Sequence, residues 1–256
     1  METEHGYVKS EIHKGVGTIK FFHPQGNSLP GSLLEELAKT INRLAHDPAV
    51  LVIILKSAGE KTFCAGASFN ELSSIKNEEE GKTFFMGFAN VINAMRKCPK
   101  FIIVRVQGKC VGGVVGLAAA ADYCIATEAA EVRLSELAVG IGPFVVGPAV
   151  ERKIGTSAFS QLAIDAVMWR NAEWAKRKGL YAEIHSNIEE MDESISKHSY
   201  FLSHSNPEAM AEMKKIFWQD CESWDHLLEE RAAISGRLVL SEFTASAIAA
   251  FKSRPK

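Results

Sequence analysis

Apolar and polar residues near the start of the chain predict a strand-rich first half. Segments 7–13 and 16–23 flank Lys14-Gly15, and their length and turn residues are typical of a β-hairpin. The run Val50–Leu55 is continuously apolar, and Phe101–Val106 follows the break at Pro99. Apolar runs of this length are typical of buried strands. The sequence therefore predicts a sheet with at least two strands in the interior.

A helix is predicted between the hairpin and the first buried strand. Leu33, Leu37, Ile41 and Leu44 recur with helical spacing, and Asp47-Pro48 ends the pattern. Ser32-Leu33-Leu34-Glu35 has the form of a capping box, in which Ser32 and Glu35 satisfy each other's backbone amides. We therefore expect this helix to begin next to Ser32.

The remaining pattern predicts strand–loop–helix units followed by a long helical region. A helix is expected over about 78–96, a loop over 108–113, a short helix over 114–121, and short strands at 123–126 and 132–134. From 149 to 252 the chain is predicted to be helical, with interruptions near 171, 179–183 and 206–207. This order indicates an α/β fold with a helical annex.

Composition narrows the function classes. The chain has 256 residues, of which 46% are hydrophobic, and a formal net charge of −2. No basic field points to nucleic acid or to an anionic membrane surface. The longest apolar stretch, 111–121, is too short to span a membrane, and the N-terminus lacks the pattern of a signal peptide. We expect a cytoplasmic protein that binds neither nucleic acid nor membrane.

The cysteines and histidines predict neither a disulfide framework nor a metal site. The five cysteines are odd in number and show no C-x-x-C spacing, and the eight histidines have no metal-ligand spacing. Most of the cysteines lie among apolar residues and are interpreted as buried thiols. We therefore expect no metal and no separate cofactor.

Two glycine-bearing loops, each after a predicted strand, are the main candidates for chemistry. The first contains Ala65-Gly66-Ala67 and the second contains Gly112-Gly113. Glycine allows close approach of a ligand to the backbone, and the free N–H groups at a helix start suit an anionic oxygen. Either loop alone is explained by tight turns. Together, they could provide the two donors of an oxyanion hole.

The ordered motifs resemble those of the enoyl-CoA hydratase/isomerase (crotonase) superfamily over nearly the whole chain. The segments that carry the resemblance are Pro24–Leu29, Phe63–Ala67, Gln107–Asp122, Ser135–Pro143, Ala172–Leu180 and Ala249–Phe251. The stretches around 98–113 and 135–155 also resemble bacterial methylglutaconyl-CoA hydratase-like and enoyl-CoA isomerase-like members.

The resemblance implies a spiral of ββα units bearing the acyl-CoA site over residues 1–190, and a helical trimerisation region over 191–256. It implies a homotrimer or a dimer of trimers that binds an acyl-CoA thioester, with coenzyme A entering only as part of the substrate. The amides of Ala67 and Gly113 would hold the thioester oxygen. Ala65, Gly66, Gly112 and Gly116 are also expected to contact the substrate.

Glu136 is the predicted acid/base, because it matches the second catalytic glutamate of the family in a Ser-Glu-Leu context. Gly116 is the main departure, since the two-glutamate hydratases of the family carry their first catalytic glutamate there. A double-bond shift can be run by one carboxylate that removes and returns a proton. Isomerisation is therefore slightly favoured over hydration of a short branched enoyl-CoA. A non-catalytic acyl-CoA binding protein is a further alternative.

Other departures concern the acyl and coenzyme A ends of the site. Ser68 replaces the usual aspartate of the first loop, and Phe144-Val145-Val146 replaces a glycine-rich stretch. We expect the stretch 144–146 to narrow or harden the acyl pocket, in favour of a compact or branched acyl group over a long flat chain, with Phe144 among the residues that contact the substrate. Phe251 and Arg254 resemble the family segment that reaches coenzyme A across a subunit boundary, with a solvated tail as the alternative. Glu71 is considered as a substitute for the missing carboxylate, with a surface role as the alternative.

Overall fold

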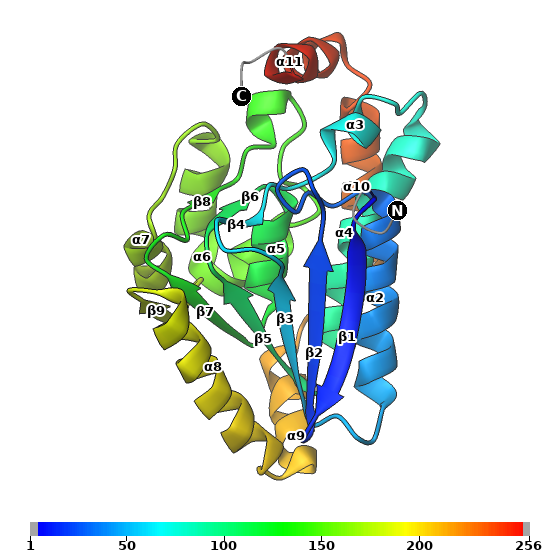
Figure 1. Cartoon of the computed structure of the whole chain (residues 1–256). Coiled ribbons are helices and arrows are strands. Elements are labelled where there is room, and N and C mark those ends of the chain that lie inside the picture. The colour runs from blue at the N-terminus through cyan, green and yellow to red at the C-terminus, as the bar shows by residue number, and fades with distance from the viewer. Residues whose placement is uncertain (1–4, 253–256) are drawn as a thin grey trace.

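The computed structural model describes residues 5–252, which form an α/β spiral followed by helices (Figure 1). The strands are β1 (Tyr7–His13), β2 (Val16–Phe22), β3 (Val52–Ser57), β4 (Thr62–Cys64), β5 (Phe101–Val106), β6 (Lys109–Val111), β7 (Tyr123–Thr127), β8 (Val132–Arg133) and β9 (Glu183–His185). The helices of the first half are α2 (Gly31–His46), α3 (Phe69–Leu72), α4 (Glu78–Lys97), α5 (Gly113–Ala120) and the 3-10 turn η1 (Leu137–Val139). Those of the second half are α6 (Gly147–Ile164), α7 (Ala172–Arg177), α8 (Ile188–Ser203), α9 (Pro207–Phe217), α10 (Trp224–Leu238) and α11 (Glu242–Lys252).

Two sheets alternate along the chain. The larger sheet has the order β1-β2-β3-β5-β7-β9, and the smaller has the order β4-β6-β8. Only the β1–β2 hairpin is antiparallel among these pairings. Successive turns of the chain thus add one strand to each sheet and then a helix, as in β5-β6-α5. The predicted spiral of ββα units is confirmed.

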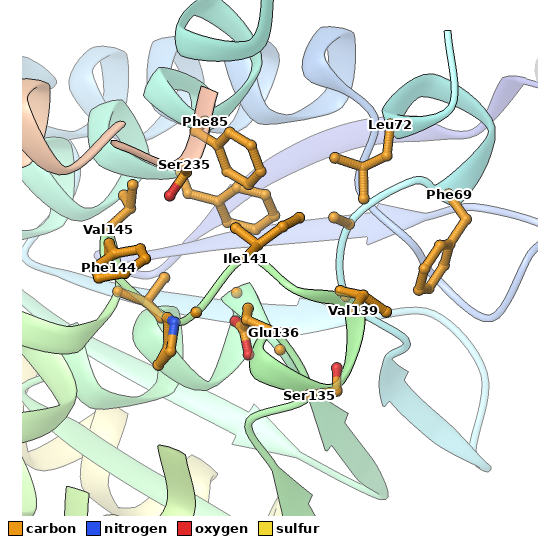
Figure 2. Close-up of a pocket in the computed structure, with 18 of the residues that line it drawn as sticks. Phe69, Leu72, Phe85, Ser135, Glu136, Val139, Ile141, Phe144, Val145 and Ser235 are labelled. Carbon is orange, nitrogen blue, oxygen red and sulfur yellow. The ribbon is translucent and has the colours of Figure 1, made fainter. Parts of the chain in front are cut away.

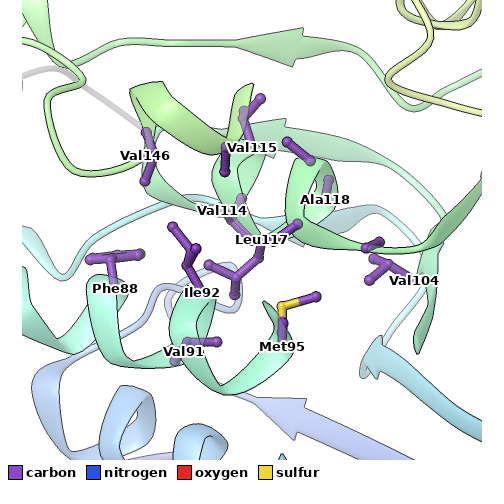
Figure 3. Packing of buried hydrophobic residues seen from close by; sticks show 14 of the residues in the cluster. Phe88, Val91, Ile92, Met95, Val104, Val114, Val115, Leu117, Ala118 and Val146 are labelled. Atoms are coloured by element: carbon purple, nitrogen blue, oxygen red, sulfur yellow. The ribbon is translucent and has the colours of Figure 1, made fainter. Parts of the chain in front are cut away.

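Both faces of the large sheet are covered, which explains why its inner strands are continuously apolar. On one face, Val52, Ile103 and Ile125 pack against Met191 and Ile195 of α8. On the other face, alternate residues of the same strands join the main core with α2, α4 and α5. Figure 3 shows part of this core, where α4 packs against α5. The strand period of two therefore divides each buried strand between two cores.

The C-terminal helices join the main core. Trp218, Trp224 and Leu228 are buried in the cluster that contains the strands and α4. Helix α10 crosses α4 where two glycines meet, because a Cβ at Gly81 would lie 2.6 Å from the carbonyl oxygen of Gly236. The boundary expected between residues 190 and 191 falls inside α8, which lies on the sheet. Whether the last helices mediate assembly stays a prediction.

Several local predictions were wrong. The capping box does not form: Pro30 is the N-cap of α2 without a side-chain cap, and Glu35 pairs with Lys39 one turn later. Ser32 is the second residue of the helix, so its hydroxyl does not occupy the N-cap position. Strand β9 was predicted only as a break between helices, because its three residues carry too little pattern to reveal pairing with β7.

Candidate active site

The first glycine loop follows β4 and is held between two other segments. Gly66 has a φ of +95°, and a Cβ there would lie 2.9 Å from the carbonyl oxygen of Val111 in the second loop. Glycine is therefore required both for the left-handed backbone and for contact between the loops. Within the described residues, the amide of Ala67 donates no hydrogen bond, whereas its neighbours Ala65 and Ser68 both do.

The second loop places Gly112 against the predicted acid/base. Gly112 has φ +62° and ψ −136°, and its amide donates to the carbonyl of Arg133 at 2.8 Å. A Cβ at Gly112 would lie 3.5 Å from Oε1 of Glu136 and 3.6 Å from Oγ of Ser135. Gly113 begins α5, and the amide of a first helical residue has no intrahelical acceptor. This loop thus presents a free N–H beside the carboxylate.

Glu136 lies at the start of η1 with its carboxylate turned into the protein. Its carbonyl accepts hydrogen bonds from Val139 and Ile141, at 3.1 and 3.0 Å, which fix the loop. The residue as a whole is partly exposed, but its Oε2 is buried and has no hydrogen-bond partner among the described residues. Loss of hydration raises the pKa of this carboxyl to about 7. It can therefore exchange a proton near neutral pH.

A narrow pocket of about 60 Å³ joins these elements (Figure 2). Its walls come from both loops, α3, α4, η1, the segment before α6, and α10. The lining residues are Ala65, Gly66, Ala67, Phe69, Leu72, Phe85, Phe88, Gly112, Gly113, Ser135, Glu136, Val139, Ile141, Gly142, Pro143, Phe144, Val145, Val146 and Ser235. Of the described residues that line it, Glu136 is the one that can carry a charge. The pocket is an apolar cavity with one carboxylate.

Gly116 does not line this pocket, and its predicted contact with substrate stays a prediction. It is buried in α5, and a Cβ there would lie 2.5 Å from the Cβ of Val146. Val146 precedes α6 and packs against α5, as Figure 3 shows. The valine side chain therefore occupies the space that a longer residue at 116 would need.

The other predicted site residues differ in whether they line the pocket. Ala65, Gly66, Ala67, Gly112, Gly113, Glu136 and Phe144 all line the pocket. The side chain of Phe251, and Arg254 as a whole, lie outside the described part of the chain. Glu71 lies away from this pocket, and its Oε2 accepts a hydrogen bond from the amide of Gly31 at 2.7 Å.

The far wall of the pocket was not predicted from the sequence; it is formed by Phe85 and Phe88 of α4 and Ser235 of α10. The apolar spacing of α4 is that of any helix facing a core, so its phenylalanines carry no separate signal. Ser235 is buried, and its hydroxyl donates to the carbonyl of Arg231. Only the crossing of α10 over α4 brings it to the site.

The described residues contain no group of three or more His, Cys, Asp or Glu side chains arranged to hold a metal ion. No helix among them combines the length and apolar character needed to cross a bilayer.

Comparisons with known proteins identify the family of this chain. A family model described as enoyl-CoA hydratase/isomerase matches residues 11–248. The chain is 31% identical over 189 residues to mitochondrial methylglutaconyl-CoA hydratase of Mus musculus, covering 73% of this chain and 60% of the mouse protein. It is 26% identical over 248 residues to peroxisomal Delta(3,5)-Delta(2,4)-dienoyl-CoA isomerase of Arabidopsis thaliana, covering 90% of this chain and 87% of the plant protein.

A solved structure shows the same fold. The crystal structure of enoyl-CoA hydratase from Bacillus halodurans superposes with a TM-score of 0.88 at 23% sequence identity, over 95% of this chain and 99% of that one. Against other curated relatives the chain spans only 52% or 35% of their length. From the match to the family model and the architecture, the chain belongs to the enoyl-CoA hydratase/isomerase family.

Proposed function

We propose that this protein is an enoyl-CoA isomerase, which shifts a carbon–carbon double bond of an acyl-CoA thioester with Glu136 as its single acid/base. The observation that carries the proposal is the presence of one carboxylate, with a pKa raised to about 7, in an otherwise uncharged pocket. Hydration needs one group to activate water and another to deliver a proton. Isomerisation needs only one.

The main-chain amides of Ala67 and Gly113 would bind the thioester oxygen. Neither amide has an acceptor within the described residues, and both belong to loops that touch through Gly66 and line the same pocket. Two fixed N–H donors stabilise the negative charge that develops on this oxygen, and each such donor is typically worth about 3 kcal/mol in the barrier.

The proposed reaction keeps its atoms within the substrate. Glu136 removes a proton from C2 of a 3-enoyl-CoA, and the electron pair of the C–H bond passes into the thioester as an enolate. The C2–C3 double bond then forms as the former C3–C4 double bond takes the same proton at C4. A carboxyl with a pKa of about 7 suits both directions, because neither its acid nor its base form dominates strongly at neutral pH.

We further propose that the acyl group is compact and uncharged. Phe144, Phe85 and Phe88 all line the small cavity, and no lysine, arginine or histidine lies among its described lining residues. An acyl group that carries a free carboxylate would bury this negative charge beside Glu136 without a counter-ion, at a cost of several kcal/mol. The pocket therefore disfavours the methylglutaconyl group.

Hydration is the second candidate, favoured by two hydroxyls in the pocket wall. Ser135 adjoins the carboxylate and Ser235 lies on the opposite helix, as Figure 2 shows. A hydroxyl can orient a water molecule, although it cannot replace a second carboxylate as a base of similar pKa. Under this reading, solvent oxygen enters the product.

The two reactions are separated by an experiment in ¹⁸O-labelled water. We would incubate the protein with 3-butenoyl-CoA, crotonyl-CoA and methylglutaconyl-CoA, and follow products by mass spectrometry. The proposal expects crotonyl-CoA from 3-butenoyl-CoA with no label. Labelled 3-hydroxyacyl-CoA as the main product would establish hydration instead, and tight binding without turnover of any thioester would indicate a non-catalytic binding protein.

We also propose assembly as a homotrimer or a dimer of trimers. Support comes from Ile164, the last residue of α6, and from Val167 and Met168 just after it, which are all more than half exposed. Neighbouring exposed apolar side chains are typical of surfaces that contact another chain. Light scattering coupled to size-exclusion chromatography would measure the mass, and a monomer at micromolar concentration would contradict the proposal.

A further inference from the structure

The segment before α2 holds the first glycine loop in place on both sides of Ala67. The carbonyl of Gly26 accepts from Ala65 at 2.9 Å, and Leu29 donates to the carbonyl of Gly66 at 2.8 Å. The carbonyl of Leu29 in turn accepts from Ser68 at 3.3 Å. These bonds skip the amide of Ala67, which is left free to face the pocket. The direction of the Ala67 amide is therefore fixed only while the segment before α2 and the first glycine loop stay in contact.

Glu71 adds a fourth hydrogen bond between these two parts of the chain, and it joins α3, which follows Ala67, to the start of α2. Its Oε2 accepts a hydrogen bond of 2.7 Å from the amide of Gly31, the first residue of α2. Pro30, the N-cap of α2, has no side-chain hydroxyl or carboxylate, so the helix receives its cap from a residue 40 positions along the chain. A carboxylate at this end is favoured by the partial positive charge of the helix.

The same residue is built into α3. The amide of Glu71 is directed to Oγ of Ser68, the N-cap of this short helix, at 3.4 Å. Phe69 and Leu72 of α3 project into the pocket, as Figure 2 shows. The carboxylate itself lies outside the pocket, half-buried behind it. Glu71 thus connects the start of α2 to a turn that carries two wall residues and adjoins Ala67.

We propose that Glu71 is a positioning residue for the oxyanion hole: its carboxylate, bound to the N-terminus of α2, holds α3 and with it the amide of Ala67 in the direction of the thioester oxygen. This inference rests on the proposed function. It makes Glu71 neither a base nor a substrate ligand. A four-residue helix has little stability of its own, so its orientation depends on such external links.

The test measures the hydrogen bond on the substrate carbonyl directly. Crotonyl-CoA labelled with ¹³C at C1 would be bound to the wild type and to variants, and its C=O stretch would be recorded by isotope-edited infrared spectroscopy. We expect a shift to lower frequency in the wild type and a smaller shift in Glu71→Ala. Turnover of 3-butenoyl-CoA should fall about tenfold in kcat with little change in KM, since complete loss of one oxyanion donor costs about 100-fold or more.

Two controls separate positioning from general damage. Glu35→Ala removes a carboxylate from the same surface groove, but within the described residues Glu35 pairs with Lys39 and not with α3. In this variant, the C=O band of bound crotonyl-CoA and the kcat should match those of the wild type. Glu71→Gln keeps an oxygen that can accept from Gly31 and should restore most of the shift and the rate.

A second route avoids changing Glu71. A Cβ at residue 31 would lie 2.9 Å from Oε1 of Glu71, so Gly31→Ala displaces the carboxylate from the opposite side and should reproduce the weakened band. If the C=O band of bound crotonyl-CoA shifts as far in Glu71→Ala and in Gly31→Ala as in the wild type, the positioning role of Glu71 is excluded while the proposed oxyanion hole stands. A wild type without any shift would instead overturn the proposed oxyanion hole.

Discussion

Glu136 combines two properties: among the described residues, one of its carboxylate oxygens has no hydrogen-bond partner, and a neighbouring loop has main-chain donors without acceptors. If it is the single acid/base, Glu136→Gln should lower the isomerisation rate about 1,000-fold, within the usual contribution of general acid–base catalysis. Affinity for acyl-CoA should change little, because glutamine has the same shape. Discontinuous activity assays would measure the isomerisation rate, and titration calorimetry would measure the affinity for acyl-CoA. Turnover that survives in the variant would remove Glu136 from its role.

The pKa of Glu136 sets the pH dependence of the reaction. Removal of the C2 proton requires the ionised carboxylate, and burial raises its pKa to about 7. The value of kcat/KM should therefore rise with pH up to about 7 and then level off, and it should be about 100-fold lower at pH 5 than on the plateau. A profile with its midpoint near 4.5 would show that this carboxyl is hydrated in the working enzyme.

The same shift predicts a change in stability. The folded-state pKa is raised from 4.5 to about 7, so between these values the folded protein retains a proton that the unfolded chain has lost. Stability should therefore fall as pH rises through this window, by at most about 3 kcal/mol. Glu136→Gln removes this penalty. Its Tm should exceed that of the wild type at pH 8 and approach it at pH 4.5, as scanning calorimetry would show; equal differences at both pH values would contradict this.

At the scale of elements, the packing of α5 against the start of α6 determines whether a second carboxylate can be accommodated. Gly116→Glu should destabilise the protein by about 1–3 kcal/mol, because its Cβ would overlap Val146. Val146→Gly removes the opposing Cβ and should cost stability on its own by leaving a cavity. The double variant should be more stable than the sum of the two single changes predicts. Urea unfolding of all four proteins measures this coupling, and strict additivity would show that the two residues do not compete for space.

At the scale of the whole molecule, a buried ion pair ties the C-terminal helices to the sheet. Nζ of Lys214 in α9 lies 2.7 Å from Oδ2 of Asp122, which also accepts from the amide of Ile102 in β5. Both side chains are almost fully buried, at 2% and 6% exposure. Lys214→Ala should therefore lower the free energy of unfolding by about 3–5 kcal/mol, since it leaves a buried carboxylate without its counter-ion.

The adjacent residue supplies the control for this prediction. Lys215 is 70% exposed and pairs only with Glu212 on its own helix, so Lys215→Ala should change stability by less than about 1 kcal/mol. Denaturant unfolding of both variants would give the comparison. Similar losses for Lys214→Ala and Lys215→Ala would show that the buried pair does not anchor α9.

Most of the elements and their order could be predicted from local sequence patterns. The hairpin, the buried strands and the helix at 78–96 follow from apolar periodicity, which depends only on neighbouring residues. The ordered motifs likewise pointed to Ala67, Gly113 and Glu136, all of which line the pocket. The failed capping box shows where local reasoning ends, because Ser32 has the right residue type but Glu71, 40 residues from Gly31, holds that helix end.

The chemical character of the site depends on tertiary contacts that the sequence does not reveal. Burial of the Glu136 carboxylate, the occupation by Val146 of the space beside Gly116, and the far wall made by α4 and α10 all depend on contacts between segments distant in sequence. The pKa of a carboxyl group and the room for a second one are set by the surrounding atoms. The order of residues along one segment does not contain that information, whereas the crossing of helices and loops does.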